Sequence, residues 1–210
     1  DGTRNVHTLT IADNEVKPAI TAHPQHVLAY VGQPLAVFVG GASGLPAPSS
    51  QWLKNGVAAA GLTSNGISIA NVPLAAAATF SLRATNKMGT VTYTATSNTA
   101  ELCVVDKTEK TVVLAAGTAS NAVFTVSTAG KLLTYEWLDS NEVPLVASTR
   151  LLNVKTKSLT IKGLTTTDTG TYICRVKGPD PAQHIDVRHN LKVVTEKPVI
   201  TDTVINLGTV

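Results

Sequence analysis

A short motif recurs along this chain and constrains its organisation more than any other feature. The residues TEKTVV at 108–113 return as TEKPVI at 195–200, which is 87 residues later. A looser copy, VKPAIT, lies at 16–21, and each copy follows one strand-like run and precedes another. Self-similarity at a fixed period indicates structural units in tandem. We therefore expect one domain over residues 16–106 and a second over residues 107–196.

The two ends of the chain extend beyond these units. Residues 1–15 resemble the closing strand of a preceding unit, and residues 197–210 resemble the start of a following one. Plain terminal extensions are the alternative, which the sequence leaves open. The chain starts at Asp1, and no basic segment followed by an apolar one stands there, so we expect no signal peptide.

Runs of alternating apolar and polar residues dominate both units, whereas helical periodicity is almost absent. The clearest runs are LAVFV (35–39), TFSLRA (79–84), AVFTV (122–126), LTYEWL (133–138), SLTIKGL (158–164), TYICRV (171–176) and NLKVV (190–194). Turn signals such as Asn55-Gly56 separate them. Many short strands separated by turns predict an all-β sandwich or barrel.

The composition supports a packed core and argues against several kinds of partner. Apolar residues make up 43% of the chain, enough for a sizeable core. The net charge of +3 is spread without a block of five or six basic residues, so we expect no nucleic-acid partner. No run of 18 apolar residues occurs, so we expect no membrane insertion.

One motif in the second unit carries a family resemblance. Trp137 lies on an expected strand, SLTIKGL follows as another, and Asp168-x-Gly170-x-Tyr172-x-Cys174 enters a third. With these residues, the chain from 111 to 195 resembles an immunoglobulin-like domain of the I-set or of the bacterial and phage group. The resemblance implies a tyrosine corner, in which the tyrosine hydroxyl bonds back to the chain before the strand.

The resemblance also assigns structural roles to single residues. Arg150 stands eighteen residues before Asp168, where such domains often place the arginine of a buried ion pair. Trp137, Tyr172 and Cys174 are expected in the core together with Asp168, Gly170 and Arg150 as structural residues of the turn.

The first unit resembles a degenerate copy of the second. QWLKNG at 51–56 supplies Trp52 as the core tryptophan, and FSLRATN at 80–86 aligns with YICRVKG at 172–178. In this alignment Leu82 takes the place of Cys174. The predicted fold class is therefore all-β: two tandem immunoglobulin-like β-sandwiches of about 90 residues each, joined by a short linker.

The usual disulfide between the two sheets is absent from both units. Its first cysteine would fall near Val37 in the first unit and near Ala122 or Phe124 in the second, and none stands there. The remaining cysteine, Cys103, belongs to the other unit. We therefore expect two buried free thiols, which favours folding in a reducing compartment such as a bacterial cell.

Candidate chemistry is sparse. His23 and His26 lie three apart in a proline-containing loop with no further ligand at metal spacing, so they are interpreted as solvated and no metal or cofactor is expected. No nucleophile motif or phosphate loop occurs, so no catalytic residue is assigned. The candidate contact loop is the hairpin KGPDPAQHIDVRH, with Asp180, His184 and Asp186, although a plain exposed turn is the alternative.

These observations predict a non-enzymatic structural and adhesive surface module. Tandem immunoglobulin-like domains without disulfides resemble the outer-capsid decoration and tail-surface proteins of tailed phages. This resemblance implies a location on the virion surface, with other virion or surface proteins as partners and cell-surface glycans as a further candidate. The alternative is a fragment of a bacterial cell-surface adhesin or extracellular array. Residues 201–210 would then allow assembly by strand complementation.

Overall fold

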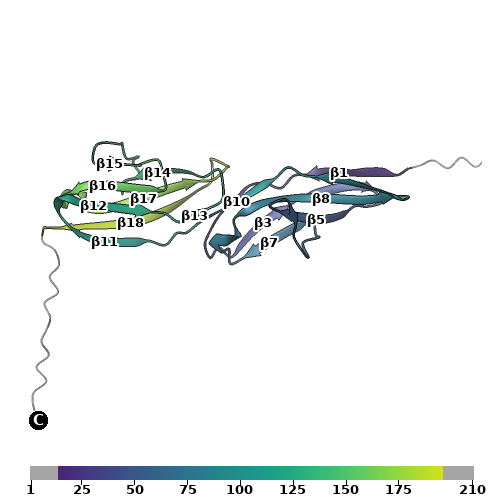
Figure 1. The fold of residues 1–210 in the computed structure, drawn as a ribbon, viewed down its shortest axis with the longest axis horizontal. Helices are drawn as coiled ribbons and strands as arrows, with labels where there is room; N and C mark the ends of the chain where they lie inside the picture. Colours follow the sequence, from purple (N-terminus) through teal and green to yellow (C-terminus); the bar gives the residue numbers. More distant parts are fainter. Residues whose placement is uncertain (1–13, 196–210) are drawn as a thin grey trace, which may run out of the picture. The chain divides into compact units, whose positions relative to one another are not determined.

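The computed structural model describes residues 14–195, and the predictions made for residues 1–13 and 196–210 lie outside this range. Within it, all regular structure is strand except two short 3-10 helices, η1 (Leu74–Ala76) and η2 (Thr166–Asp168). Figure 1 shows the strands gathered into two groups along the chain. The predicted all-β class with two tandem immunoglobulin-like sandwiches is confirmed.

The first sandwich contains ten strands. They are β1 (Val16–Ala22), β2 (Val27–Tyr30), β3 (Leu35–Val39), β4 (Gly41–Leu45), β5 (Ser49–Lys54), β6 (Val57–Ala58), β7 (Gly66–Ala70), β8 (Ala78–Met88), β9 (Val91–Thr96) and β10 (Ala100–Val105). Strand β8 is central, because β5, β9 and β10 all pair with it antiparallel. Strands β3 and β7 form a separate two-stranded sheet, and β1 pairs with β4.

The second sandwich contains two sheets. Its strands are β11 (Lys110–Ala115), β12 (Gly117–Thr125), β14 (Thr134–Leu138), β15 (Leu151–Leu152), β16 (Ser158–Leu164), β17 (Gly170–Lys177) and β18 (His184–Val194). One sheet has the order β11-β18-β17-β14 and the other the order β12-β16-β15. Strand β11 runs parallel to β18, whereas the other pairs are antiparallel.

The contacts divide the chain into two compact units whose limits differ from the repeat. Unit 1 includes Leu35–Ile69 and Ala78–Leu102, whereas unit 2 takes Leu28–Pro34, Ala70–Ala77 and the chain from Cys103 onward. The division falls inside β10 because a short strand of unit 2, β13 (Thr128–Ala129), pairs with the end of β10. The repeat limits 16–106 and 107–196 stay a proposal.

The same core arrangement occurs in both sandwiches. Trp52 lies opposite Leu82 across β5 and β8, and Trp137 lies opposite Cys174 across β14 and β17. All four side chains are fully buried. Each indole N–H donates to a carbonyl, that of Ser64 or Thr156, so burying each tryptophan leaves no unpaired donor.

The position of the missing disulfide is filled by apolar side chains. In the second sandwich Ala122 and Phe124 point inward, as expected, and each is 1% exposed. In the first sandwich the cysteine was expected near Val37; Val37 itself is 46% exposed, whereas its neighbour Phe38 is 1% exposed and packs against Phe80. Adjacent strand residues face opposite sides, so a shift of one residue exchanges core for surface.

The expectation of two buried cysteines without a disulfide is confirmed. Cys103 and Cys174 are both buried and neither forms a disulfide. The Cys103 thiol donates to the carbonyl of Lys131 at 3.0 Å. Burial raises the pKa of the Cys174 thiol to about 12, so this thiol stays protonated at neutral pH.

Candidate binding surface of the second sandwich

The turn before β17 forms the tyrosine corner that the motif suggested. The hydroxyl of Tyr172 donates to the carbonyl of Asp168 at 2.8 Å, and the ring stacks on Phe124 with centroids 5.9 Å apart. A capping box between Thr165 and Asp168 begins the helix η2, and one carboxylate oxygen of Asp168 accepts from both the backbone N–H (2.7 Å) and the hydroxyl (3.0 Å) of Thr165.

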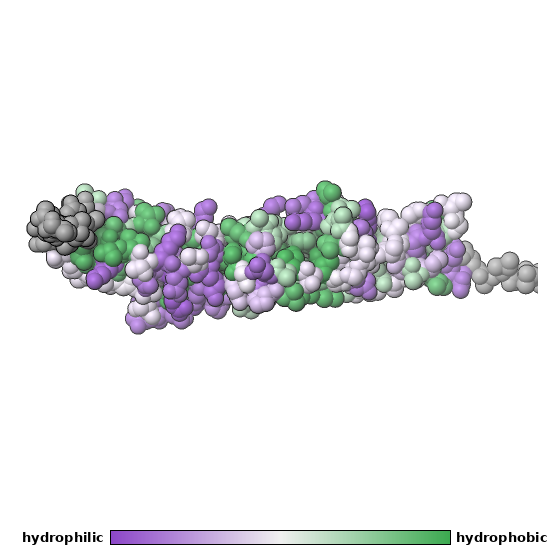
Figure 2. All heavy atoms as spheres, turned by 90° about the horizontal axis from the view of Figure 1, so that it is seen from below, coloured by the Kyte–Doolittle hydropathy of each residue, from purple (hydrophilic) through white to green (hydrophobic). Residues whose placement is uncertain are grey.

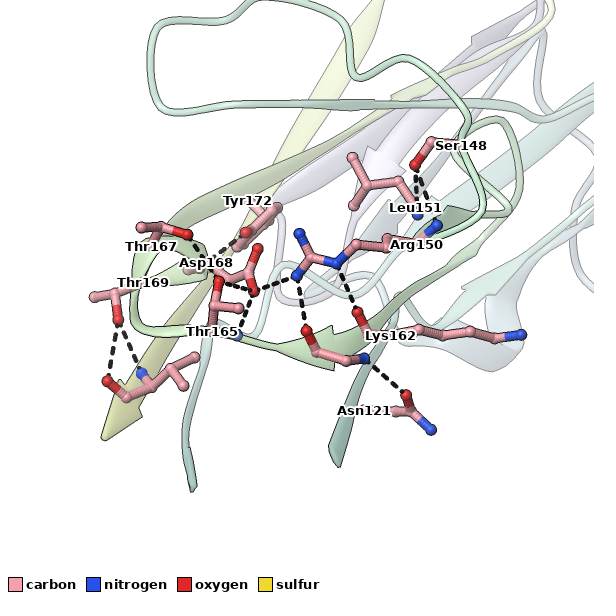
Figure 3. A network of polar contacts seen from close by, with 12 residues as sticks. Asn121, Ser148, Arg150, Leu151, Lys162, Thr165, Thr167, Asp168, Thr169 and Tyr172 are labelled. Carbon is pink, nitrogen blue, oxygen red and sulfur yellow. Dashed lines mark hydrogen bonds and ion pairs between the residues drawn. The ribbon is translucent and has the colours of Figure 1, made fainter. Parts of the chain in front are cut away.

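Arg150 joins this turn to the neighbouring strand, as Figure 3 shows. Its Nη2 lies 2.6 Å from Oδ2 of Asp168 and also donates to the carbonyl of Gly163, while Nε donates to that of Lys162. The side chain of Arg150 is 47% exposed and that of Asp168 is 14% exposed. The pair that was expected in the core therefore lies at the surface, where ion pairs contribute little stability.

The hydrogen bonds at this turn lower the pKa of Asp168. Partial burial opposes ionisation, but the hydrogen bonds from Thr165 and Arg150 outweigh it and lower the pKa of the carboxyl group below its usual value. The carboxylate is therefore a structural acceptor that holds the turn closed.

Gly170 was expected to be a glycine that the turn requires, but the structure shows no such requirement. It is exposed at the start of β17, it is outside the left-handed backbone region, and an added Cβ would meet no atom within 4 Å. Neither backbone conformation nor close packing explains glycine at this position.

A small hollow lies beside the corner. It has a volume of about 290 Å³, and its lining includes Asp139, Ser148, Arg150, Asp168 and Tyr172. In Figure 3 two of the three guanidinium nitrogens of Arg150 carry the dashed bonds, and the third carries none. The hollow thus combines a positive donor, carboxylates and an aromatic ring, the mixture of polar and apolar groups expected of a small-ligand site.

A second, more apolar hollow of about 540 Å³ lies next to the connection after β14. Its lining includes Glu136, Leu145, Val146, Val154 and Lys155. Val146 is 80% exposed at its edge. Both hollows belong to the second sandwich.

The candidate contact loop is the turn between β17 and β18, and its three residues have different surroundings. The carboxylate of Asp180 accepts from the backbone N–H of Ala182 and the side chain of Gln183, so it stabilises the turn itself. His184 is exposed at the start of β18. Asp186 lies two residues further on the same face of the strand.

Asp186 is not free to contact a partner by itself. Its carboxylate receives two hydrogen bonds from Arg175, at 2.9 and 2.8 Å, and the same guanidinium bonds Glu142 at 2.8 Å. Across the sheet Glu136 stands opposite Arg175, which stands opposite Asp186. The structure therefore presents a paired row of charges, and of the three predicted residues His184 is the one that is most available.

Large apolar side chains are exposed at scattered positions on both sandwiches. Figure 2 shows such residues in green among purple hydrophilic ones on the face that it draws. The large apolar residues that are exposed on either sandwich include Val16, Leu35, Val37, Val39, Val57, Val91, Val123, Leu132, Val143 and Val146. Isolated exposed apolar residues are ordinary, but three of these lie on β3 alone.

The histidines of the first sandwich serve as local acceptors. The rings of His23 and His26, both exposed, accept from the backbone N–H groups of Asn98 and Glu101 through Nδ1. Across residues 14–195, no group of three or more His, Cys, Asp and Glu side chains is placed to hold a metal ion. In the same range no helix is long and apolar enough to cross a membrane.

Sequence reasoning missed one buried polar residue, His189. It is 1% exposed and lies on β18 against the rings of Phe124 and Trp137, which also lie beside each other with centroids 6.4 Å apart. The signal that could have found it is the alternation in HNLKVV, since His189 shares its strand face with Leu191 and Val193.

No family model and no curated protein match the chain. Among solved structures it is similar to immunoglobulin domains 1–4 of Sidekick-1, with 21% identity, a TM-score of 0.45, and coverage of 88% of this chain and 51% of that one. Extracellular domains 3–5 of Drosophila OTK are 18% identical (TM-score 0.42, covering 85% and 62%). The tandem Ig repeats of Dlar are 22% identical (TM-score 0.39, covering 85% and 98%). The chain spans less than two thirds of the Sidekick-1 and OTK structures.

The class of the fold follows from the strand topology and core already described. Each repeat pairs a tryptophan strand with the strand that follows the turn, and the second repeat adds the tyrosine corner. The protein is a tandem immunoglobulin-like β-sandwich protein that lacks disulfides within the described residues.

Proposed function

We propose that the protein is a non-enzymatic structural and adhesive surface module, and that it decorates a phage virion on the capsid or the tail. One end or edge of the chain docks on the particle. The remaining surface, above all the β17–β18 turn with His184, is displayed for weak binding to cell surfaces and their glycans.

The observation that carries this proposal is the chemistry of the two cores. Phe38 and Leu82 in the first sandwich, and Phe124 and Cys174 in the second, are buried side chains of the core, and neither Cys103 nor Cys174 forms a disulfide. Such domains need no oxidising compartment to fold, which suits a protein that assembles into particles inside a bacterial cell.

The same chemistry supports a role without catalysis. The thiol of Cys174, the nucleophile type most reactive at neutral pH, is buried, and its pKa is raised to about 12. The carboxylates of Asp168 and Asp186 are held by hydrogen bonds within the fold.

Fractionation of lysate from the source cells tests the virion assignment. Particles and cell envelopes are separated on a density gradient, and peptides of this chain are quantified by mass spectrometry in each fraction. The proposal expects the chain to sediment with particles and to remain there after a salt wash. Recovery only with the envelope contradicts the virion role and favours the adhesin.

Binding of the labelled chain to bacterial cells by flow cytometry tests the displayed surface. We expect His184→Ala to weaken binding, because this side chain is exposed and outside the ion-pair network. Lys54→Ala, an exposed change in the first sandwich, is the matched control and should bind like the parent. Equal binding by all three proteins would remove the β17–β18 turn from the proposal.

The alternative is a fragment of a bacterial adhesin or extracellular array that assembles by strand complementation. One observation favours it: β12 is an edge strand, since within residues 14–195 it pairs with β16 on one side, and Val123 on it is 60% exposed. Exposed edges accept an added strand. We propose residues 201–210 of a neighbouring copy as that strand. Deleting them should abolish assembly in sedimentation experiments while the monomer stays folded, and assembly that survives the deletion rules this alternative out.

A further inference from the structure

The side chain of His189 is an ionisable group enclosed in the core of the second sandwich. It is 1% exposed, and its ring lies nearly parallel to that of Phe124, with centroids 5.1 Å apart and an angle of 8° between the planes. The ring of Trp137 lies 5.6 Å away. Neither ring nitrogen has a hydrogen-bond partner among the described residues.

The two strands that pair with β18 place no carboxylate directly opposite His189. On β17 the opposite residue is Tyr172, whose hydroxyl already bonds Asp168. On the other side the opposite residue is Lys110 of β11, with Glu109 beside it. The strands β12 and β14 present Phe124 and Trp137.

The titratable groups nearby do not stabilise a charged ring on balance. Burial lowers the pKa of His189 most, the positive charge of Lys110 lowers it further, and Glu109 opposes both. Burial raises the pKa of Tyr172 and that of Cys174 on the same strand, so both groups are neutral in mildly acidic solution.

We propose that His189 is an acid-sensitive element of the second sandwich, because a protonated ring packed against Phe124 and Trp137 would have two buried N–H donors and no acceptor. The faces of these two rings attract a cation, which offsets part of the cost of charging the histidine. A buried charge without a hydrogen-bond partner nevertheless costs more than such an attraction returns. Protonation of His189 therefore favours the unfolded chain over the closed sandwich.

The direction of the pH effect follows from linkage. His189 binds a proton more readily in the unfolded chain, where the pKa of histidine is about 6.5, than in the fold. Its contribution to stability is complete above that value and falls as the pH drops below it. Mild acid thus lowers the stability of the second sandwich, which carries both hollows.

Calorimetric melting of the full chain between pH 7.5 and about 5 tests the proposal. The transition of the second sandwich is identified as the one that Tyr172→Phe lowers. In the parent protein we expect the melting temperature of this transition to fall by about 5 °C or more across the range. In His189→Phe, where an apolar ring keeps the stacking, the fall should be largely lost. His184→Gln, an exposed change on the same strand, should retain it.

A flat profile in the parent protein, or an equal fall in His189→Phe, overturns the proposal. Because His189→Phe could fail to fold, NMR titration of the parent protein gives an independent measurement. The ring signal that is missing in His189→Gln should titrate in the native protein at a lower pH than the value of about 6.5 that is usual for histidine. A normal titration of His189 near 6.5 would also overturn the proposal.

Discussion

Cys174 lies directly opposite Trp137 across β14 and β17, in the position that Leu82 takes opposite Trp52 in the first sandwich. The side chains of Cys174 and Leu82 thus occupy equivalent core positions in the two repeats of one chain. Both are fully buried, and each lies opposite a tryptophan whose indole N–H donates to a carbonyl. The conserved element of the two repeats is therefore the tryptophan strand and its partner, and the cysteine is one of several ways to fill the space.

Thiol titration tests the state of the two cysteines. In the native protein we expect Cys103 and Cys174 to react slowly, because both are buried and the pKa of Cys174 is raised to about 12. After denaturation without reductant, a chromogenic disulfide reagent should find both thiols. Recovery of none would indicate a bridge and would remove the argument for a reducing compartment.

The tyrosine corner predicts a specific loss of stability. Tyr172→Phe removes the hydroxyl that bonds the carbonyl of Asp168 and leaves the stacking on Phe124 in place. Such a bond contributes about 1 kcal/mol to the free energy of unfolding. Urea denaturation should show this decrease for Tyr172→Phe, whereas Tyr93→Phe keeps the ring that lies under Lys17 and should change stability little. An equal effect of both changes would contradict a special role for the corner.

Arg150 and Asp168 should contribute unequally to the free energy of unfolding. The ion pair is half exposed at Arg150, so a double-mutant cycle with Arg150→Ala and Asp168→Asn should give a coupling of about 1 kcal/mol or less. Asp168→Asn alone should cost more than Arg150→Ala, because it weakens the two bonds to Thr165 that close the turn, whereas the bonds from Arg150 to the carbonyls of Lys162 and Gly163 are exposed to solvent. A larger loss from Arg150→Ala would mean that the strand connection matters more than the capped turn.

The lowered pKa of Asp168 predicts an acid effect distinct from that of His189. Its stabilising contribution is complete above the unfolded value of about 3.9 and is lost as the pH falls through the lower folded value. In Asp168→Asn this part of the pH dependence should disappear, while the change expected between about pH 6.5 and 5 should remain. Stability curves measured by urea denaturation at each pH separate the two.

The register of β3 can be tested by adjacent substitutions. Phe38→Ala opens a cavity against Phe80 and should lower the free energy of unfolding by about 3–5 kcal/mol. Val37→Ala, one residue away and 46% exposed, should cost about 0.5 kcal/mol or less. A reversed order of the two effects in chemical denaturation would show that the strand is shifted by one residue.

Much of the fold could be predicted from local patterns. The alternating runs give strands because successive side chains face opposite sides, and the repeat gives two units because each copy carries the same order of strands. The alignment of FSLRATN with YICRVKG placed Leu82 and Cys174 at corresponding positions, and both lie opposite a tryptophan. These features depend on neighbours along the chain, so they can be predicted without the tertiary structure.

The sequence by itself therefore determined the class of the fold, the two repeats and the tryptophan and cysteine positions. The tertiary structure decided what depends on segments far apart in the chain. It placed Arg150 at the surface, tied Asp186 to Arg175, and faced Phe38 rather than Val37 inward. It also buried His189 against Phe124 and Trp137. Burial and ion pairing are properties of groups brought together by folding, and no spacing along a single strand specifies which partner another strand will supply.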